Sequence, residues 1–174
     1  NPAMMFFNPT FTEIWIVNLG DFGIINNDAC SIAILDVNTL TVAATIPAPD
    51  YGFGFGSNVV FSQDGAYAFL SSTYSDEIVK IDTTTRQVAE TLKLVVANPY
   101  YYTSVGPAWL TLSHDGTFLC STNTFNETVS VVSTGTLAEV HQIHFRDPTT
   151  LLHVPNFTFR NNVLLNDDDT IGFI

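Results

Sequence analysis

The chain has 174 residues, and its five Lys plus Arg against seventeen Asp plus Glu give a formal net charge of −12 at pH 7. A surface with this charge repels phosphate backbones and anionic lipid headgroups, so we expect no nucleic acid partner and no anionic membrane partner. No apolar run reaches the roughly 18 residues of a membrane-spanning helix, so we also expect no membrane insertion. Only 13% of residues are charged, and the abundant Ser, Thr and Asn favour an extracellular or cell-surface protein.

Two similar pentapeptides, Phe61-Ser-Gln-Asp-Gly65 and Leu112-Ser-His-Asp-Gly116, lie 51 residues apart. The segments that follow them repeat at the same spacing, Ile78-Val-Lys-Ile-Asp82 with Val129-Ser-Val-Val-Ser133. A period near 50 residues is typical of a four-stranded unit, which must stack on its neighbours because one small antiparallel sheet cannot bury both of its faces alone. The predicted fold is therefore all-β, a β-propeller of four-stranded antiparallel blades.

Four strands are expected in each unit, and the expected strands follow in chain order: 3–7, 13–18, 31–36 and 41–46 in the first unit, 58–61, 67–71, 77–82 and 87–94 in the second, and 108–112, 118–122, 128–132 and 139–145 in the third. The Asp-Gly pairs after two of the first strands predict hairpin turns, because glycine accepts a positive φ. Val and Ile dominate the third strands, as in half-buried strands. The fourth strands carry more charge, which suits an outer edge.

A fourth unit is expected to begin at Pro155, with a strand at 156–159, a turn at 166–169 and a second strand at 170–174. The domain prediction is one partial propeller over 1–174, with blades over 1–50, 56–96 and 106–146 and an incomplete blade over 154–174. Propellers usually close with about 4 to 8 blades, so we expect a piece of a longer polypeptide that forms a larger ring. The alternative is that two or more chains assemble through their blade edges and complete one ring.

Two sequons, Asn126-Glu-Thr128 and Asn156-Phe-Thr158, predict N-glycosylation at Asn126 and Asn156 if the chain follows a secretory route. Asn126 falls in the turn between the second and third strands of its unit, where a glycan could project into solvent. Sequons also arise by chance in a chain rich in Asn and Thr. Cys120 falls within a second strand and is predicted to be a small buried residue, whereas Cys30, at the entry to a third strand, is expected in a loop.

No catalytic, cofactor-binding or metal-binding residue is predicted. His141 and His144 are three apart on an expected strand, where side chains alternate, so the two imidazoles point in opposite directions. Asp167-Asp-Asp169 lacks the spaced pattern of a calcium loop and is expected to be a solvated turn. The glycine-rich segment 51–56 has no following helix and no Gly-Lys-Ser/Thr, so it fits no nucleotide-binding motif.

The connections between consecutive units carry the candidate binding residues. Each connection leaves an outer strand and starts the next inner strand, so both should emerge on the same face of the disc. A cluster of aromatic side chains there would bind a protein or a glycan; the alternative is that the connections pack against each other. The residues concerned are Phe53, Phe55, Tyr100, Tyr101 and Tyr102.

The units resemble the YVTN-type β-propeller repeats, which are named after a Tyr-Val-Thr-Asn tetrapeptide. The counterparts of that tetrapeptide are Trp15-Ile-Val-Asn18, Phe69-Leu-Ser-Ser72 and Cys120-Ser-Thr-Asn123. The strand that follows also matches, for example Glu77-Ile-Val-Lys-Ile-Asp-Thr83. The resemblance implies a propeller, but the family includes surface-layer and other cell-surface propellers as well as lactonases and quinone-dependent amine dehydrogenases.

The enzymes of that family place charged groups around the central channel, whereas the expected inner strands read Met-Met-Phe-Phe, Val-Val-Phe and Trp-Leu-Thr-Leu. These strands are apolar. We therefore favour a structural or binding scaffold outside the cell or on its surface, as part of a larger surface assembly. A lactonase-like or quinoprotein-like enzyme with its site in the central channel is the alternative.

Overall fold

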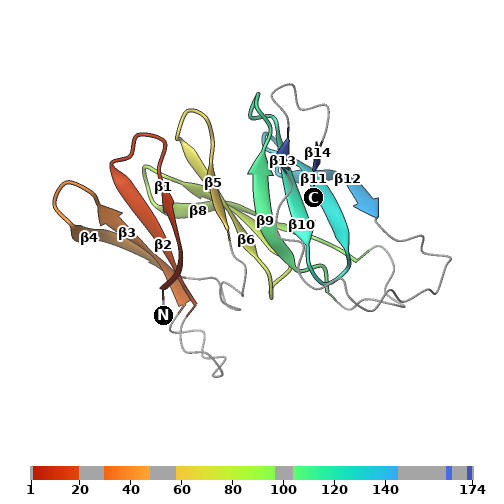
Figure 1. Cartoon of the computed structure of the whole chain (residues 1–174), viewed down its shortest axis with the longest axis horizontal. Coiled ribbons are helices and arrows are strands. Elements are labelled where there is room, and N and C mark those ends of the chain that lie inside the picture. Colours follow the sequence, from red (N-terminus) through yellow and green to blue (C-terminus); the bar gives the residue numbers. More distant parts are fainter. Residues whose placement is uncertain are drawn as a thin grey trace.

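The computed structural model describes residues 2–19, 30–47, 58–96, 104–144, 164–165 and 172–173. These residues form three four-stranded antiparallel sheets and one two-stranded pair, and all their regular elements are strands (Figure 1). The first sheet holds β1 (Pro2–Phe7), β2 (Glu13–Leu19), β3 (Cys30–Asp36) and β4 (Thr41–Pro47). The second holds β5 (Val59–Phe61), β6 (Tyr67–Ser72), β7 (Glu77–Asp82) and β8 (Gln87–Lys93). The third holds β9 (Pro107–Leu112), β10 (Phe118–Asn123), β11 (Thr128–Ser133) and β12 (Ala138–His144).

In every sheet the strands lie side by side in chain order, so each sheet is an up-and-down meander. The fourth strands β4, β8 and β12 are mostly exposed, as expected for outer edges. At the opposite edge the first strand of the third sheet, β9, contacts both β5 and β6 of the second sheet. This arrangement confirms the predicted fold, a partial β-propeller of four-stranded blades.

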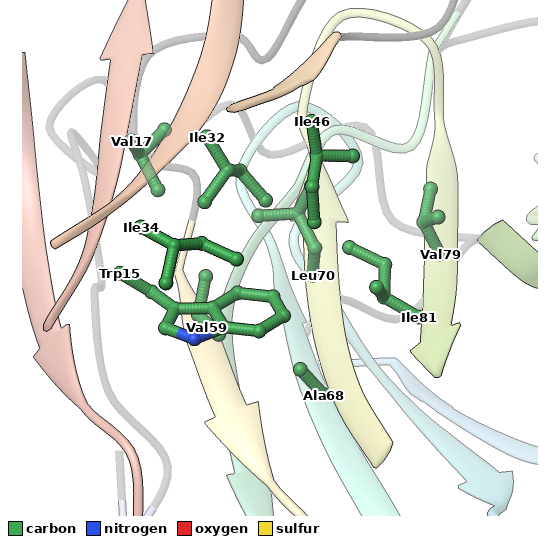
Figure 2. Close-up of a cluster of buried hydrophobic side chains, with 10 residues drawn as sticks. All are labelled: Trp15, Val17, Ile32, Ile34, Ile46, Val59, Ala68, Leu70, Val79 and Ile81. Carbon is green, nitrogen blue, oxygen red and sulfur yellow. The ribbon is translucent and has the colours of Figure 1, made fainter. Parts of the chain in front are cut away.

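The blades are held together by apolar side chains that fill the space between facing sheets. Trp15, Ile32 and Ile34 of the first sheet meet Leu70 and Ile81 of the second in one buried cluster (Figure 2). All five side chains are at most 1% exposed. Because each fully buried side chain of this kind stabilises the fold by about 1.5–3 kcal/mol, a blade owes its stability to its neighbours.

A second cluster joins the second and third sheets in the same way. Phe69 and Ile78 face Leu110, Leu119 and Val132 across the gap. Successive residues of a strand point to opposite faces, so Phe69 and Leu70 serve different interfaces. One blade therefore packs on both of its neighbours.

The turn between the first and second strands explains why Ser-x-Asp-Gly repeats. The Ser62 hydroxyl accepts the N–H of Tyr67 at 2.9 Å and donates to Asp64 at 2.7 Å. Ser113 makes the same two bonds to Phe118 and Asp115, at 2.9 and 2.8 Å. Gly65 and Gly116 have φ of 71° and 74°, a left-handed conformation that costs glycine little.

The first blade closes the equivalent turn with different residues. Asn8 takes the place of the serine, and its Oδ1 accepts the N–H groups of Thr12 and Glu13 at 2.9 and 3.0 Å. Phe11 takes the place of the glycine and keeps a positive φ of 56°. The hydrogen bonding of the turn is thus conserved in a sequence without Asp-Gly.

Three Lys or Arg residues lie within the described parts of the chain, and each reaches a segment that is distant in sequence. Arg86 forms an ion pair with Glu13 of the neighbouring blade at 2.7 Å. Lys80 lies 4.4 Å from the ring centroid of Tyr67 and donates to the carbonyl of Thr134 in the third blade at 3.3 Å. The third, on β8, donates to a carbonyl in the turn between β6 and β7.

The predicted and observed strands of the three complete blades agree to within about one residue at each end. In the fourth unit β13 (Leu164–Leu165) pairs with β14 (Gly172–Phe173), and β14 lies within the expected second strand at 170–174. The expected strand at 156–159 and the turn at 166–169 lie outside the described residues, and the blade boundaries stay predictions. Cys120 is 8% exposed on β10, which confirms it as buried. Cys30 is the first residue of β3, so it lies at the entry to the third strand, as expected, and belongs to the strand instead of the loop.

Candidate binding face

The turns between second and third strands lie at the opposite end of the sheets from the Ser-x-Asp-Gly turns. Tyr74, in the second blade, and Phe125, in the third, hold equivalent positions in these turns, 51 residues apart. Their rings stack across the blade boundary, with centroids 6.2 Å apart and an interplanar angle of 26°. The two residues are 62% and 39% exposed. A stacked aromatic pair, here called the aromatic platform, therefore bridges two blades and faces solvent.

The platform depends on a glycine just before β9. Gly106 has a φ of 66°, and a Cβ at this position would lie 2.4 Å from Cδ2 of Phe125. A backbone hydrogen bond holds the same two segments together, because the N–H of Phe125 donates to the carbonyl of Val105 at 3.1 Å. Any side chain larger than hydrogen at position 106 would displace the Phe125 ring.

Asp76 holds the segment that carries this glycine against the second blade. Its Oδ1 accepts the hydroxyl of Ser104 at 2.6 Å and the N–H groups of Val105 and Gly106, both at 2.8 Å. Asp76 itself has a positive φ of 56°. One carboxylate oxygen thus fixes the start of the third blade to the turn that carries Tyr74.

Behind the platform lies a network of buried polar side chains in the third blade. The Asn123 amide donates to the hydroxyls of Thr128 and Ser130, both at 2.8 Å. Thr128 in turn donates to Oδ1 of Asn126 at 2.8 Å. Buried polar groups need such partners, so this network gives the last residue of the Cys120–Asn123 tetrapeptide a structural role.

This network also bears on the sequon at Asn126. The residue is 4% exposed, and its side-chain oxygen accepts the Thr128 hydroxyl of the same sequon. The position is a turn, as expected, but its amide packs inward in the folded chain. Glycosylation of Asn126 stays a prediction, and Asn156 lies outside the described residues.

The other predicted binding residues also lie outside the described residues, so their grouping stays a prediction: Phe53, Phe55, Tyr100, Tyr101 and Tyr102. Sequence reasoning missed Tyr74 and Phe125, although their 51-residue spacing repeats that of the Asp-Gly turns. It also missed Asp76, whose partners lie about 30 residues away and follow no local motif.

The remaining candidate sites are placed as follows. His141 and His144 both lie on β12. Among the described residues, no group of three or more His, Cys, Asp or Glu side chains is arranged to hold a metal ion. No helix in the described part of the chain is long and apolar enough to cross a membrane.

No protein-family model matches the chain, and no curated protein matches it in sequence. Among solved structures, it is similar to a protein from Bacteroides fragilis assigned provisionally as a 6-phosphogluconolactonase, with a TM-score of 0.66 and 16% identity over 97% of this chain and 46% of that one. It is also similar to hydrazine synthase from Kuenenia stuttgartiensis, with a TM-score of 0.64 and 17% identity over 84% of this chain and 36% of that one. It is also similar to the RRP9 WD40 repeats, with a TM-score of 0.63 and 17% identity over 82% of this chain and 38% of that one.

These similarities concern the fold alone, because the identities are low. The three structures include two named as enzymes or enzyme candidates and one WD40 repeat protein, so the fold is shared by different functions. The chain spans less than half the length of each of them.

Proposed function

We propose that the chain is a YVTN-type binding propeller, extracellular or on the cell surface, that contacts a polypeptide partner through its aromatic platform. The observation that carries this proposal is the stacked and exposed pair of Tyr74 and Phe125. Rings that are already held in place offer a large contact area and lose little conformational freedom on binding. Asp76 and Gly106 hold the platform before any partner arrives.

The charge of the molecule favours a basic polypeptide as the partner. A net charge of −12 steers cationic segments toward the surface, and the exposed face of Tyr74 can receive a Lys or Arg side chain by a cation–π contact. A neutral glycan gains the stacking contact but not the attraction by charge. The predicted residues of the connections, such as Phe53 and Tyr101, are proposed as additional contacts.

The proposed extracellular setting rests on the sequence, with its low content of charged residues and its two sequons. An antibody against the chain should label intact source cells or their medium. Labelling only after permeabilisation would argue against this setting. Glycosidase treatment of the natural protein should shift its mass if Asn126 or Asn156 carries a glycan.

The binding proposal is tested with a displayed library of random peptides and, in parallel, a glycan array. The wild-type chain should enrich Lys- and Arg-rich peptides, and the Tyr74→Ser/Phe125→Ser double variant should lose at least about tenfold of that enrichment, because hot-spot aromatic residues dominate binding energy. Val140→Ser, at a site 54% exposed on β12, is the matched control and should bind like wild type. Equal enrichment by the double variant, or binding to glycans alone, would overturn the proposal.

A lactonase-like enzyme is the second candidate, because the provisionally assigned 6-phosphogluconolactonase matches 97% of the chain. The first strands of the blades, which form the inner edge, argue against it. β1, β5 and β9 read Pro-Ala-Met-Met-Phe-Phe, Val-Val-Phe and Pro-Ala-Trp-Leu-Thr-Leu, without an acid or a base. If the chain hydrolyses 6-phosphogluconolactone faster than the spontaneous reaction, measured as acid release, it is a lactonase and not a binding propeller alone.

A further inference from the structure

A short segment just before β9, residues 104–107, is hydrogen-bonded to both of the turns that carry the aromatic platform. We call this segment the strap. On the side of the second blade, Oδ1 of Asp76 accepts three donors of the strap. The Thr73 hydroxyl donates to the carbonyl of Pro107 at 2.8 Å. The strap is therefore fixed to the turn that carries Tyr74.

On the side of the third blade the strap is held by backbone groups. The N–H of Thr124 donates to the carbonyl of Gly106 at 2.8 Å, next to the bond that the N–H of Phe125 makes. Since the strap joins both turns, the rings of Tyr74 and Phe125 cannot move apart unless it detaches from one of them. The stacked platform thus exists only while the two blades are docked at this end.

The first residues of β9 are held to the second blade in the same way. The Ser71 hydroxyl donates to the carbonyl of Ala108 at 2.8 Å. The N–H of Leu110 donates to Oδ1 of Asn58 at 3.0 Å. Ser71 and Asn58 are at most 2% exposed. Along the strap and the start of β9, hydrogen bonds from side chains of the second blade therefore hold the third blade.

The boundary between the first and second blades is built differently. The positions equivalent to Asn58, Ser71 and Thr73 lie 54 residues earlier. They hold apolar side chains without an N–H or O–H group: Met4, Val17 and Leu19. A hydrogen bond that breaks on opening is replaced by one to water, so it opposes opening less than a buried apolar side chain does. The strap end of the second boundary is therefore the end that opens at lower cost.

We propose that the strap end of the boundary between the second and third blades opens locally in the free chain, and that a partner on the aromatic platform holds it closed. This inference rests on the proposed function, because it needs a partner that contacts both rings. Tyr74 and Phe125 belong to different blades, so such a partner finds its full contact surface only in the closed form. Binding and closure must then favour each other to the same extent.

The size of the coupling follows from the concentration of the partner. A partner that binds only the closed form lowers the open population by a factor of one plus its concentration divided by its dissociation constant. At ten times the dissociation constant this factor is about ten. The affinity itself changes little as long as the open form is rare.

The test is hydrogen exchange of the whole chain followed by mass spectrometry. In the free chain, residues 104–110 should exchange at least about tenfold faster than β6, which is almost entirely buried. The probe is a Lys- and Arg-rich peptide that the wild-type chain enriches from the displayed library, added at ten times its dissociation constant. It should slow exchange at 104–110 about tenfold and leave β4, at the outer edge of the first blade, unchanged.

A matched pair of variants separates opening from binding. Thr73→Val removes the bond to the carbonyl of Pro107 and changes neither ring of the platform. It should speed exchange at 104–110 in the free chain by about two- to tenfold, while the affinity for the peptide stays within about twofold of wild type. Thr91→Val, at an exposed position on β8 of the same blade, is the control and should leave exchange at 104–110 unchanged.

The outcomes distinguish this coupling from the proposed function. A peptide that binds without slowing exchange at 104–110 overturns the coupling and leaves the proposed function standing. If no peptide binds, the proposed function fails and the coupling fails with it. Exchange at 104–110 that is as slow as that of β6 in the free chain, or equal in both variants, shows that this end of the boundary does not open by itself. Thermal unfolding of each variant confirms that it is folded.

Discussion

At position 11 the chain has a phenylalanine where the other two complete blades have glycine. Phe11 has a φ of 56°, a left-handed conformation that costs a residue with a Cβ about 1–2 kcal/mol. Phe11→Gly removes this cost and loses the contact with the Phe7 ring, whose centroid lies 5.7 Å away. We expect the free energy of unfolding, measured in urea titrations, to rise by up to about 1 kcal/mol. The gain is no larger because glycine loses more conformational entropy on folding, and this loss offsets part of the relieved strain.

The control for this prediction is another exposed phenylalanine. Phe118 lies within β10 without a positive φ and is 43% exposed, so Phe118→Gly should lower stability, since glycine weakens a strand interior. If both variants lose stability, Phe11 is not strained in the folded chain.

Gly106 and Gly135 form a second matched pair at the scale of single residues. Gly106→Ala places a Cβ in the Phe125 ring at a positive φ and should lower the free energy of unfolding by about 1–3 kcal/mol. Gly135→Ala has nothing within 4 Å of the new Cβ and should stay within about 0.5 kcal/mol of wild type. Thermal unfolding of the two variants is the measurement. Equal losses of stability in both would contradict the role of Gly106 under the aromatic platform.

At the scale of elements, the blades close their turns with aspartates whose carboxylates accept local hydrogen bonds. The bonds lower the pKa of each aspartate below its usual 3.8; the main donor is the Thr39 N–H for Asp36, the Ser62 hydroxyl for Asp64, the Thr85 N–H for Asp82 and the Thr117 N–H for Asp115. A lowered pKa in the folded state stabilises the fold above the unfolded pKa, and this contribution is lost as the pH falls through the lowered value.

An Asp64→Asn/Asp115→Asn double variant should therefore lose less stability between pH 5 and pH 2 than wild type does. The measurement is the urea midpoint at a series of pH values. Val88→Ser, which changes β8 without touching a titratable group, should keep the wild-type pH profile. A double variant with an unchanged acid profile would show that these turns do not contribute to the acid sensitivity.

The strands themselves could be predicted because their signals are local. Two of the hairpins carry Asp-Gly, and β7 and β11 are rich in Ile and Val, so their ends fall within about a residue of prediction. The positive φ of Phe11 could not be predicted, because Asn8-Pro9-Thr10 lacks glycine and only the repeat aligns this turn with the others. Asp76 and the Tyr74–Phe125 stack become visible only after the blades are packed, since each contact joins residues from neighbouring blades.

At the scale of the whole molecule, stability should decrease from the middle of each blade toward its outer edge. The middle strand β6 is almost entirely buried, whereas β8 has one half-buried residue among exposed ones. Amides in elements with few buried contacts exchange through small local openings. Hydrogen exchange followed by mass spectrometry should show peptides from β4, β8 and β12 exchanging at least about tenfold faster than those from β2, β6 and β10. Uniform exchange across the strands would instead indicate that each blade opens as one unit.

The placement of the few cations has a practical consequence for proteolysis. Trypsin cuts only after Lys or Arg, and it needs an extended and locally mobile segment around the bond. In the described parts of the chain, Lys80 and Lys93 lie on paired strands, and Arg86 ends a tight turn that its N–H closes onto Asp82 at 2.8 Å. Trypsin should therefore leave these parts of the folded protein intact, and cleavage there would report that a blade has come apart.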